Sequence, residues 1–360
     1  EVQSFEVPDP APGTFIVKVE LACICGTDAH IYHGRLPSIK FPVILGHEFT
    51  GTIAALGEGV TKDYTGKPIK VGDRVAMRPG YNCGYCYECM VMKMPGRCRN
   101  RKDTYGFKSP VATAPQLSGG FAQYMYAFNE NSVFFKTELP PTVSVLMEPL
   151  TISLHAVERA RIQLGSTVVV QGTGAIVLFA IAGAKLSGAS RIVAIGGPED
   201  RLSLAREFGA DYTIDIAKAT TPEERRVLVN EALGSDRGAT AVIGCVGHPK
   251  AFMEGLALTA AGGVIAEVGH FTDNGAISFN PYSDLLWRNC DVAGVLGAGS
   301  NPPAMFHRSI SILESGRFPF DKMVSHQVPF SRIEEAIQAM STTYSLDGRD
   351  LIKVAVNPWA

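Results

Sequence analysis

A cysteine, a histidine and two glutamates of this chain have the side chains of a metal centre. Cys25 opens the stretch Cys-Gly-Thr-Asp-Ala-His, and the segment from Cys25 to Glu48, which includes His47, spans 24 residues. Glu148 stands 100 residues after Glu48, directly before a proline. A thiolate, an imidazole and a carboxylate are typical ligands of a catalytic zinc ion that keeps one coordination position open. We expect Cys25, His47 and Glu148 to be the ligands, with Glu48 as an alternative ligand or a close neighbour.

The residues that follow Cys25 carry groups that could support such a centre. Asp28 is expected to hold the far ring nitrogen of His47, which fixes the tautomer and raises the basicity of the ring. Thr27 and His30 could relay a proton to solvent, because histidine titrates near neutrality. The simpler interpretation makes His47 an ordinary core histidine and Cys25 a small buried group. It makes Thr27 and His30 plain turn and surface residues.

Four cysteines form a second cluster with metal-binding spacing. Two residues separate each of the first three, and the fourth follows nine residues after the third, at Cys83, Cys86, Cys89 and Cys98. Four thiolates on one loop favour a closed tetrahedral zinc site with Zn–S bonds of about 2.3 Å. An iron–sulfur cluster is the chemical alternative, but the ferredoxin run has its fourth cysteine closer and followed by proline, where this chain has Arg99. Four free thiols are the remaining alternative.

The other cysteines carry less information. The chain has eight cysteines among 360 residues, and a cluster of this kind in a long chain indicates metal binding before disulfides. We therefore expect a reducing, cytoplasmic compartment. Cys245 and Cys290 are interpreted as buried structural thiols. Cys23 could face the same side of its strand as Cys25, and Cys25 is preferred as the ligand because of the residues that follow it.

A glycine turn between a predicted strand and a predicted helix indicates a nucleotide site. Strand 167–171 is followed by Gly-Thr-Gly and by a helix over 175–186. This arrangement directs backbone N–H groups and the helix dipole at a pyrophosphate. A valine replaces the third glycine of the Gly-x-Gly-x-x-Gly fingerprint, which serves helix packing more than phosphate contact. A plain strand–turn–helix is the alternative. The predicted coenzyme-binding residues are Gly172, Thr173, Gly174, Ala175, Ile176 and Val177.

The end of the next predicted strand, 191–195, bears on the choice of coenzyme. Domains that prefer NAD usually carry an acid there for the ribose hydroxyls. This chain has glycine at that place, with Glu199 and Asp200 three and four residues later and Arg201 beside them. The acids fit NAD, whereas Arg201 fits the 2′-phosphate of NADP. We favour NAD over NADP and leave the choice open.

The pattern of predicted elements changes at Pro149. Before it, short strands are separated by glycine and proline, at 15–21, 51–56, 71–76 and 120–126. After it, strands alternate with helices, which gives a parallel sheet covered on both faces. The expected helices are 149–161, 175–186 and 201–208, and the expected strands are 167–171, 191–195, 212–215, 241–245 and 264–268. Val246 and Gly269, which follow the last two strands, are added to the predicted coenzyme site. Mixed structure returns in 297–360, with helices near 304–315 and 330–341 and a strand at 351–356.

Composition excludes several functional classes. Hydrophobic residues make up 46% of the chain and charged residues 19%, which is typical of a globular protein. The net charge of −2 gives no electrostatic reason to expect nucleic acid or an anionic membrane as a partner. The sequence contains no uninterrupted apolar run of about 18 residues, the length that would indicate a membrane span.

Taken together, these motifs resemble the zinc-containing medium-chain alcohol and polyol dehydrogenases over nearly the whole chain. The resemblance implies a GroES-like catalytic domain, split in sequence over 1–149 and 297–360, and a doubly wound Rossmann coenzyme domain over 150–296. It places a structural-zinc lobe at about 80–100. The motifs that carry it include Gly46-His-Glu, Val71-Gly-Asp-Arg-Val, Gly119-Gly-Phe-Ala-Gln-Tyr and Glu148-Pro-Leu.

The resemblance also implies roles for individual residues. It assigns Cys25, His47 and Glu148 to the catalytic zinc and the four clustered cysteines to a structural zinc, so two zinc ions per chain. Lys353 matches a position that in some members is a basic residue near the coenzyme pyrophosphate. Glu148 stands where many simple alcohol dehydrogenases have cysteine, which is more similar to the polyol, sugar and threonine dehydrogenases. The stretch Gly294-Val-Leu-Gly resembles the dimer-forming strand, so a homodimer or homotetramer is expected.

The predicted function is therefore zinc-dependent hydride transfer between an alcohol, secondary or polyol, and NAD(P). The predicted partners are this small-molecule substrate and further copies of the chain, with no nucleic acid and no membrane. Two alternatives stay open at this point. One is a zinc-free quinone or enone reductase on the same fold, against which the Cys25, His47 and Glu148 set argues. The other is a non-enzymatic, zinc-stabilised binding protein.

Overall fold

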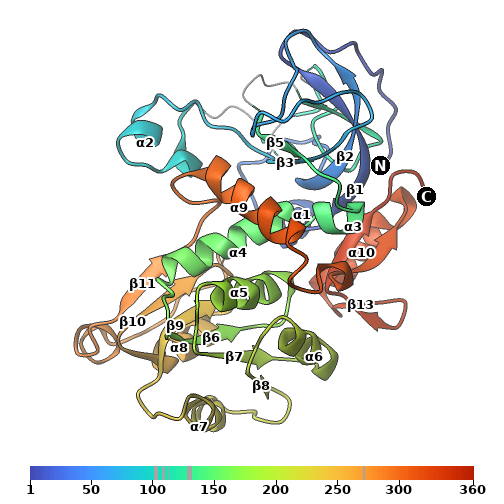
Figure 1. Ribbon diagram of the computed structural model, residues 1–360. Coiled ribbons are helices and arrows are strands. Elements are labelled where there is room, and N and C mark those ends of the chain that lie inside the picture. The colour runs from blue at the N-terminus through green and yellow to red at the C-terminus, as the bar shows by residue number, and fades with distance from the viewer. Residues whose placement is uncertain (101–103, 108–109, 113, 128–131, 271) are drawn as a thin grey trace. The chain divides into compact units, whose positions relative to one another are not determined.

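The chain forms two compact units (Figure 1). The computed structural model describes residues 1–100, 104–107, 110–112, 114–127, 132–270 and 272–360. The first unit comprises Glu1–Glu148 and Ser300–Ala360, and the second comprises Pro149–Gly299. Each unit has its own sheet, and the two are described separately below. Among the described helices, none is both long and apolar enough to cross a membrane.

A mixed sheet forms the core of the first unit, with β1 (Phe15–Cys23) at its centre. All but two residues of β1 are buried, because it pairs antiparallel with three other strands. The strand order is β12-β15-β1-β2-β3-β5, with β4 also paired to β1. The bounds are β2 (Glu48–Leu56), β3 (Arg74–Met77), β4 (Tyr124–Ala127), β5 (Phe134–Lys136), β12 (Val324–Val328) and β15 (Lys353–Val356), with a small hairpin of β13 (Ser345–Leu346) and β14 (Arg349–Asp350).

Apolar side chains from these strands make the core of the unit. One cluster includes Phe15, Phe49 and Met125, and a second joins Ile24 to Val354 and to helix α10 (Ile333–Ser341). The return segment at 300–360 therefore completes the core that the N-terminal strands begin. The other helices of the unit are α1 (Gly26–Tyr32), α2 (Tyr87–Met90), α3 (Pro141–Ser144) and α9 (Pro302–Glu314), with short 3-10 turns at Pro95–Arg97, Phe320–Lys322 and Phe330–Arg332.

Helix α1 is an element that the sequence pattern does not predict. The Asp28 carboxylate accepts a hydrogen bond from the backbone N–H of Cys25 at 2.8 Å, as the third helical residue does in a capping box. Cys25 has extended backbone angles and is the N-cap. Its thiol therefore stands at the start of a helix.

The second unit is a doubly wound, fully parallel sheet. Its strand order is β11-β10-β9-β6-β7-β8, and every neighbouring pair is parallel. Helices α5 and α6 cover one face, and α7 and α8 cover the other (Figure 1). The fold class predicted from the sequence, a β-rich unit with a doubly wound α/β unit, is confirmed. The strands are β6 (Thr167–Gln171), β7 (Arg191–Gly196), β8 (Tyr212–Asp215), β9 (Ala239–Gly244), β10 (Thr259–Glu267) and β11 (Asp291–Gly294).

The helices of this unit differ from the predicted ones in number and start. Helix α4 begins at Met147, two residues before the proline that was expected to open it, and two helices that are not among the expected ones connect β8 to β9 and β9 to β10. The helices are α4 (Met147–Arg159), α5 (Ala175–Leu186), α6 (Glu199–Glu207), α7 (Pro222–Leu233) and α8 (Pro249–Leu258), with a π-helical turn at Pro281–Leu286.

Candidate metal centres and coenzyme site

Cys25, His47 and Glu48 meet at one end of the β1–β2 strand pair. Cys23, the last residue of β1, lies opposite Glu48, the first residue of β2. This register brings Cys25, two residues after β1, beside His47, which directly precedes β2. One ligand atom from each of Cys25, His47 and Glu48 lies within 4.8 Å of the other two. The centre is thus assembled by an antiparallel pairing.

Asp28 links the two halves of this cluster. It is fully buried, and its Oδ1 lies 3.4 Å from Nδ1 of His47 while its Oδ2 accepts from the N–H of Cys25. Burial alone would lower the pKa of His47, but the neighbouring Asp28 and Cys25 raise the pKa of this ring well above its usual value. Asp28 thereby directs Nδ1 toward itself and leaves Nε2 as the nitrogen for a metal.

Lys353 is the partner of Glu48. Its Nζ lies 2.7 Å from Oε1 and 2.5 Å from Oε2 of that carboxylate, and both side chains are buried. Burial disfavours the ammonium, yet the Glu48 carboxylate raises the pKa of Lys353 above its usual value. The resemblance suggested a contact between Lys353 and the coenzyme pyrophosphate. That assignment stays a prediction, and in this structure the ammonium is buried and paired with the Glu48 carboxylate.

Glu148 is not in the ligand group. Among the described residues, the group whose ligand atoms are mutually within 4.8 Å contains Glu48 and leaves Glu148 out. The pKa of Glu148 is raised to about 7, because burial and the nearby Glu48 carboxylate together outweigh the opposing effects of His47 and Lys353. Glu148 therefore lies near enough to the cluster to interact with its charged groups. Glu48, the expected alternative ligand, is the carboxylate that the pairing of β1 with β2 brings into this group, and the expectation that Glu148 is the third ligand stays a prediction.

Thr27 and His30 lie one turn apart on helix α1. Both are half-buried, and the thiol of Cys25 donates to Oγ1 of Thr27 at 3.6 Å. Burial, with Arg35 and His33 nearby, lowers the pKa of His30. The hydroxyl is therefore at the cluster and the imidazole is one helical turn further along the chain.

The donor set of this cluster fits zinc. One thiol, one imidazole and one carboxylate converge from buried or half-buried positions, and three such protein ligands are the usual set of a catalytic zinc. The ring of Phe107 packs edge-on against His47, with 5.3 Å between the centroids. This contact makes one side of the centre apolar.

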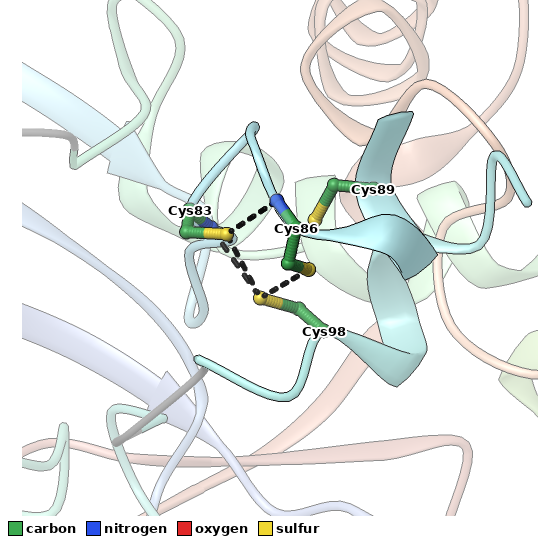
Figure 2. A group of neighbouring side chains, drawn as sticks. All are labelled: Cys83, Cys86, Cys89 and Cys98. Carbon is green, nitrogen blue, oxygen red and sulfur yellow. Dashed lines mark hydrogen bonds between the residues drawn. The ribbon is translucent and has the colours of Figure 1, made fainter. Parts of the chain in front are cut away.

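The four clustered cysteines lie around a common point (Figure 2). Sγ of Cys98 is 3.6 Å from Sγ of Cys83 and 3.8 Å from Sγ of Cys86. Tetrahedral zinc with Zn–S bonds of about 2.3 Å requires sulfur atoms about 3.8 Å apart. The cluster therefore fits a closed zinc site, and helix α2, which begins after Cys86 and contains Cys89, supplies its local geometry.

Backbone groups favour the thiolate form of Cys83, one of these four cysteines. The N–H of Cys86 donates to Sγ of Cys83 at 3.3 Å, and the N–H of Cys83 donates to Sγ of Cys98 at 3.5 Å. Although desolvation opposes it, N–H donation from Tyr85 and Cys86 lowers the pKa of Cys83 to about 6. A thiolate is the form of cysteine that binds a metal.

The glycine turn of the second unit leaves room for a phosphate. Gly172 has a φ of 107°, a conformation that favours glycine. A Cβ on Gly174, the N-cap of α5, would meet no atom within 4 Å. Open space before a helix N-terminus fits a pyrophosphate. Val177 packs on the turn, because a Cβ on Gly172 would lie 3.1 Å from its Cγ2.

The other residues predicted to bind coenzyme lie around this turn. Thr173 donates its hydroxyl to the carbonyl of Gly197 at 2.6 Å, which joins the turn to the end of β7. Ala175 and Ile176 form the first turn of α5. Val246 is exposed after β9, and Gly269 follows β10 with its backbone against the 245–247 segment.

The end of β7 holds no acidic side chain. A Cβ on Gly196 would lie 2.5 Å from Cγ2 of Thr173, so the close packing of the two turns excludes a side chain there. Glu199 forms an ion pair with Arg206 at 2.5 Å. Arg201, the residue considered for a 2′-phosphate, is only 8% exposed.

Sequence reasoning missed the pairing of Lys353 with Glu48. The two residues are 305 positions apart, and they meet because β15 pairs with β1, which places Cys23 opposite Ala355. Only the alternation of the last strand could have indicated a buried lysine.

Comparisons with known proteins agree with this geometry. Residues 11–137 match the alcohol dehydrogenase GroES-like domain, and residues 175–315 match the zinc-binding dehydrogenase family. A 5-exo-hydroxycamphor dehydrogenase of Pseudomonas putida is 34% identical over 94% of this chain and 92% of its own length. An erythritol/L-threitol dehydrogenase of Mycolicibacterium smegmatis is 32% identical over 99% of this chain and 94% of its own.

Solved structures show the same fold. An alcohol dehydrogenase of Thermotoga maritima superposes with a TM-score of 0.89 at 28% identity, covering 98% of this chain and 94% of that one. A Sinorhizobium meliloti protein described as a zinc-binding dehydrogenase, bound to NADP, gives a TM-score of 0.82 at 28% identity, with coverage of 98% and 94%.

Proposed function

Since this chain belongs to the zinc-containing medium-chain alcohol and polyol dehydrogenases, we propose how its own residues carry out the reaction of that family. The chain is an NAD(P)-dependent alcohol dehydrogenase of the zinc type. The observation that supports the residue roles is the convergence of Cys25, His47 and Glu48 at the end of the β1–β2 pair. No finding favours a zinc-free reductase or a non-enzymatic protein.

Each residue of the first centre has a distinct task. Cys25, His47 and Glu48 would hold zinc, which supplies a Lewis acid for the alcohol oxygen when it is bound. Asp28 orients the imidazole of His47 through the 3.4 Å contact. Lys353 compensates the charge of Glu48 in a buried position.

Thr27 and His30 transfer the proton of the alcohol to solvent. The hydroxyl of Thr27, which lies 3.6 Å from Sγ of Cys25, takes the proton of the alcohol and passes one on toward His30, a turn further along α1. His30 is half-buried and can release that proton to solvent. The nicotinamide supplies the hydride acceptor when the coenzyme is bound.

The substrate is a secondary alcohol or a polyol. The two relatives reported above are named for a hydroxycamphor and for erythritol and L-threitol, and each name describes a hydroxylated carbon skeleton. Glu148 lies near the centre but outside its ligand group. Its carboxyl can therefore accept a hydrogen bond from a second hydroxyl, which favours a polyol.

The coenzyme is NAD in preference to NADP. Arg201 is buried, and Arg206 is paired with Glu199. The Lys218 ammonium is 3.8 Å from the carboxylate of Asp215, at the end of the neighbouring strand. A 2′-phosphate would compete with these carboxylates for the nearby cations, whereas ribose hydroxyls could donate to the carboxylates. Equilibrium binding of NADH and NADPH tests the preference, and tighter NADPH binding would reverse it.

Two zinc ions per chain follow from the two centres. The cysteine lobe would hold one closed zinc and the Cys25 centre the other. The four thiolates of the cysteine lobe need a reducing compartment, so a cytoplasmic location is proposed. Metal content measured by atomic spectroscopy should be two zinc ions per chain.

Self-association is proposed through the outer edge of the parallel sheet. β11 is the last strand of that sheet, and exposed apolar side chains lie in it and on either side of it in the sequence, at Tyr282, Leu286, Trp287, Val292 and Leu296. A second exposed apolar group lies on the cysteine lobe, at Tyr85, Tyr87, Met90, Val91, Met92 and Met94. One patch suffices for a homodimer and two allow a homotetramer. Light scattering of the Trp287→Arg variant should show a smaller assembly than that of the unmodified chain.

Turnover of a panel of alcohols tests the function as a whole. Zinc-replete protein is mixed with NAD or NADP and with aliphatic, cyclic and aromatic alcohols, polyols and threonine, and the absorbance of the reduced nicotinamide is followed. Turnover that disappears on chelation and returns with zinc is expected, with the highest kcat/KM on a secondary alcohol or polyol. Turnover that survives complete zinc removal would overturn the role of the Cys25 centre.

A further inference from the structure

Glu267 and His270 form a hydrogen-bonded pair at the end of β10, in the coenzyme unit. Oε1 of Glu267 accepts from Nδ1 of His270 at 3.0 Å and from the backbone N–H groups of Gly269 and His270 at 2.8 and 3.1 Å. The carboxylate therefore fixes both the loop and the ring. Because Nδ1 donates to the carboxylate, Nε2 is the ring atom left for another partner. The imidazole is about a quarter exposed, at 26%, so a ligand can reach it.

Two glycines allow this pair to lie where it does. A Cβ on Gly244, the last residue of β9, would lie 2.3 Å from Oε2 of Glu267, so the carboxylate lies over the end of β9. A Cβ on Gly269 would lie 2.3 Å from the backbone nitrogen of Gly247. The loops after β9 and β10 thus pack backbone to backbone. His270 is held against the end of the sheet.

A chain of contacts joins His270 to the glycine turn. Cγ2 of Val246 lies 3.5 Å from the place that a Cβ on Gly172 would take. Val246 and Gly247 belong to the loop after β9, against which Gly269 packs. The pair thus stands two strands from the glycine turn, at the end of β10 and on the side away from β7.

The strand order indicates which nucleotide of the coenzyme would lie beside the Glu267–His270 pair. A doubly wound sheet binds a dinucleotide across the point where the strand order reverses, here between β6 and β9, with one nucleotide on each half. The ribose of adenosine belongs to the end of the strand after the glycine turn, which is β7. The nicotinamide nucleotide therefore belongs to the β9–β10–β11 half, where His270 stands.

We propose that His270, oriented by Glu267, is a coenzyme-binding residue that hydrogen-bonds a ribose hydroxyl or the carboxamide of the nicotinamide nucleotide. This inference rests on the proposed coenzyme site and adds a polar anchor beyond the glycine turn. The glycine turn would then bind the pyrophosphate of any adenine dinucleotide, whereas the Glu267–His270 pair would bind only the nicotinamide nucleotide.

Three ligands of decreasing size test the proposal in the zinc-replete full chain. NADH carries both nucleotides, ADP-ribose lacks the nicotinamide but keeps its ribose, and ADP lacks both. Dissociation constants are measured by NADH fluorescence and by calorimetry for the unmodified chain and for His270→Ala. Loss of one hydrogen bond should weaken NADH binding about tenfold, while ADP binding stays unchanged. His248→Ala is the matched control, because His248 caps α8 by accepting from the N–H of Lys250.

The outcomes separate this inference from the wider function. Weaker NADH and ADP-ribose binding with unchanged ADP assigns the bond to the ribose, and weaker NADH binding alone assigns it to the carboxamide. Unchanged NADH binding, or equal weakening of NADH and ADP, overturns the role of His270 while the dehydrogenase function stands. If no ligand binds the unmodified chain, the coenzyme site itself fails. Thermal unfolding of each variant controls for folding.

Glu267 is a positioning residue, and its test is a double-mutant cycle. Glu267→Gln keeps the shape of the side chain but removes its charge, so NADH binding should weaken by less than in His270→Ala. The double variant should bind NADH no more weakly than His270→Ala alone, because Glu267 acts through the ring. Additive losses in the double variant would overturn this positioning role.

Discussion

The two cysteine-bearing centres of this chain are built in opposite ways. The cysteine lobe takes its four sulfur atoms from residues 83–98, and backbone N–H groups of the same loop donate to them. The Cys25 centre takes its groups from the end of β1, the start of β2 and a last strand 305 residues away. One centre is a local property of a loop and the other is a product of the sheet. Substitutions in the cysteine lobe should therefore affect only that loop, whereas substitutions at the Cys25 centre should abolish catalytic turnover.

The largest effect is expected from Cys25→Ser. Loss of the thiolate removes a zinc ligand, and loss of Lewis acid stabilisation worth about 4 kcal/mol lowers kcat about 10³-fold. Zinc content should fall from two ions to one per chain, because the cysteine lobe keeps its own. Cys290→Ala is the matched control, since that thiol lies in the apolar core of the coenzyme unit. A variant that kept both zinc ions and its turnover would remove Cys25 from the ligand set.

The second largest effect is a loss of zinc affinity, which should distinguish Glu48 from Glu148. Glu48→Gln should weaken zinc binding at this centre by more than about 100-fold, because it removes a ligand charge and leaves the Lys353 ammonium buried without a counter-charge. Glu148→Gln should change zinc affinity much less. Competition with a chelator measures both constants. If Glu148→Gln lost zinc and Glu48→Gln did not, the original expectation from the sequence would be right.

A smaller effect is expected from Asp28→Asn. The amide cannot hold the imidazole of His47 as the carboxylate does, so zinc affinity should fall by about 10- to 100-fold. The N–H of Cys25 would still find an oxygen acceptor at this position, so helix α1 should form. Far-ultraviolet circular dichroism and a zinc titration measure the two properties. A loss of fold together with zinc would show that Asp28 acts mainly as a helix cap.

The smallest effect on turnover is expected from Cys98→Ser. The lobe should lose its zinc and become sensitive to proteases within residues 80–100, since a closed zinc site holds its loop together. Turnover per remaining catalytic zinc should fall only severalfold. Limited proteolysis with mass spectrometry, combined with the zinc count, measures this. Loss of turnover as deep as in Cys25→Ser would contradict the independence of the two centres.

Much of the fold was readable because the signals are local. The parallel strands are short apolar runs, and strands 167–171 and 212–215 have the bounds expected from the sequence. Helix α7 was also open to prediction. It starts with the capping box of Thr221 and Glu224, has Pro222 in its first turn and ends at Gly234 in the left-handed conformation.

The sequence by itself determined the donor types and the lobe, because cysteines three residues apart on one loop cannot lie far from each other. It also determined the phosphate turn, whose strand, glycines and helix are contiguous. Only the tertiary structure brings Glu48 into one group with Cys25 and His47, since that grouping depends on the register that sets Cys23 opposite Glu48. It also decided the partner of Lys353, because strand pairing joins residues whose separation along the chain carries no local signal.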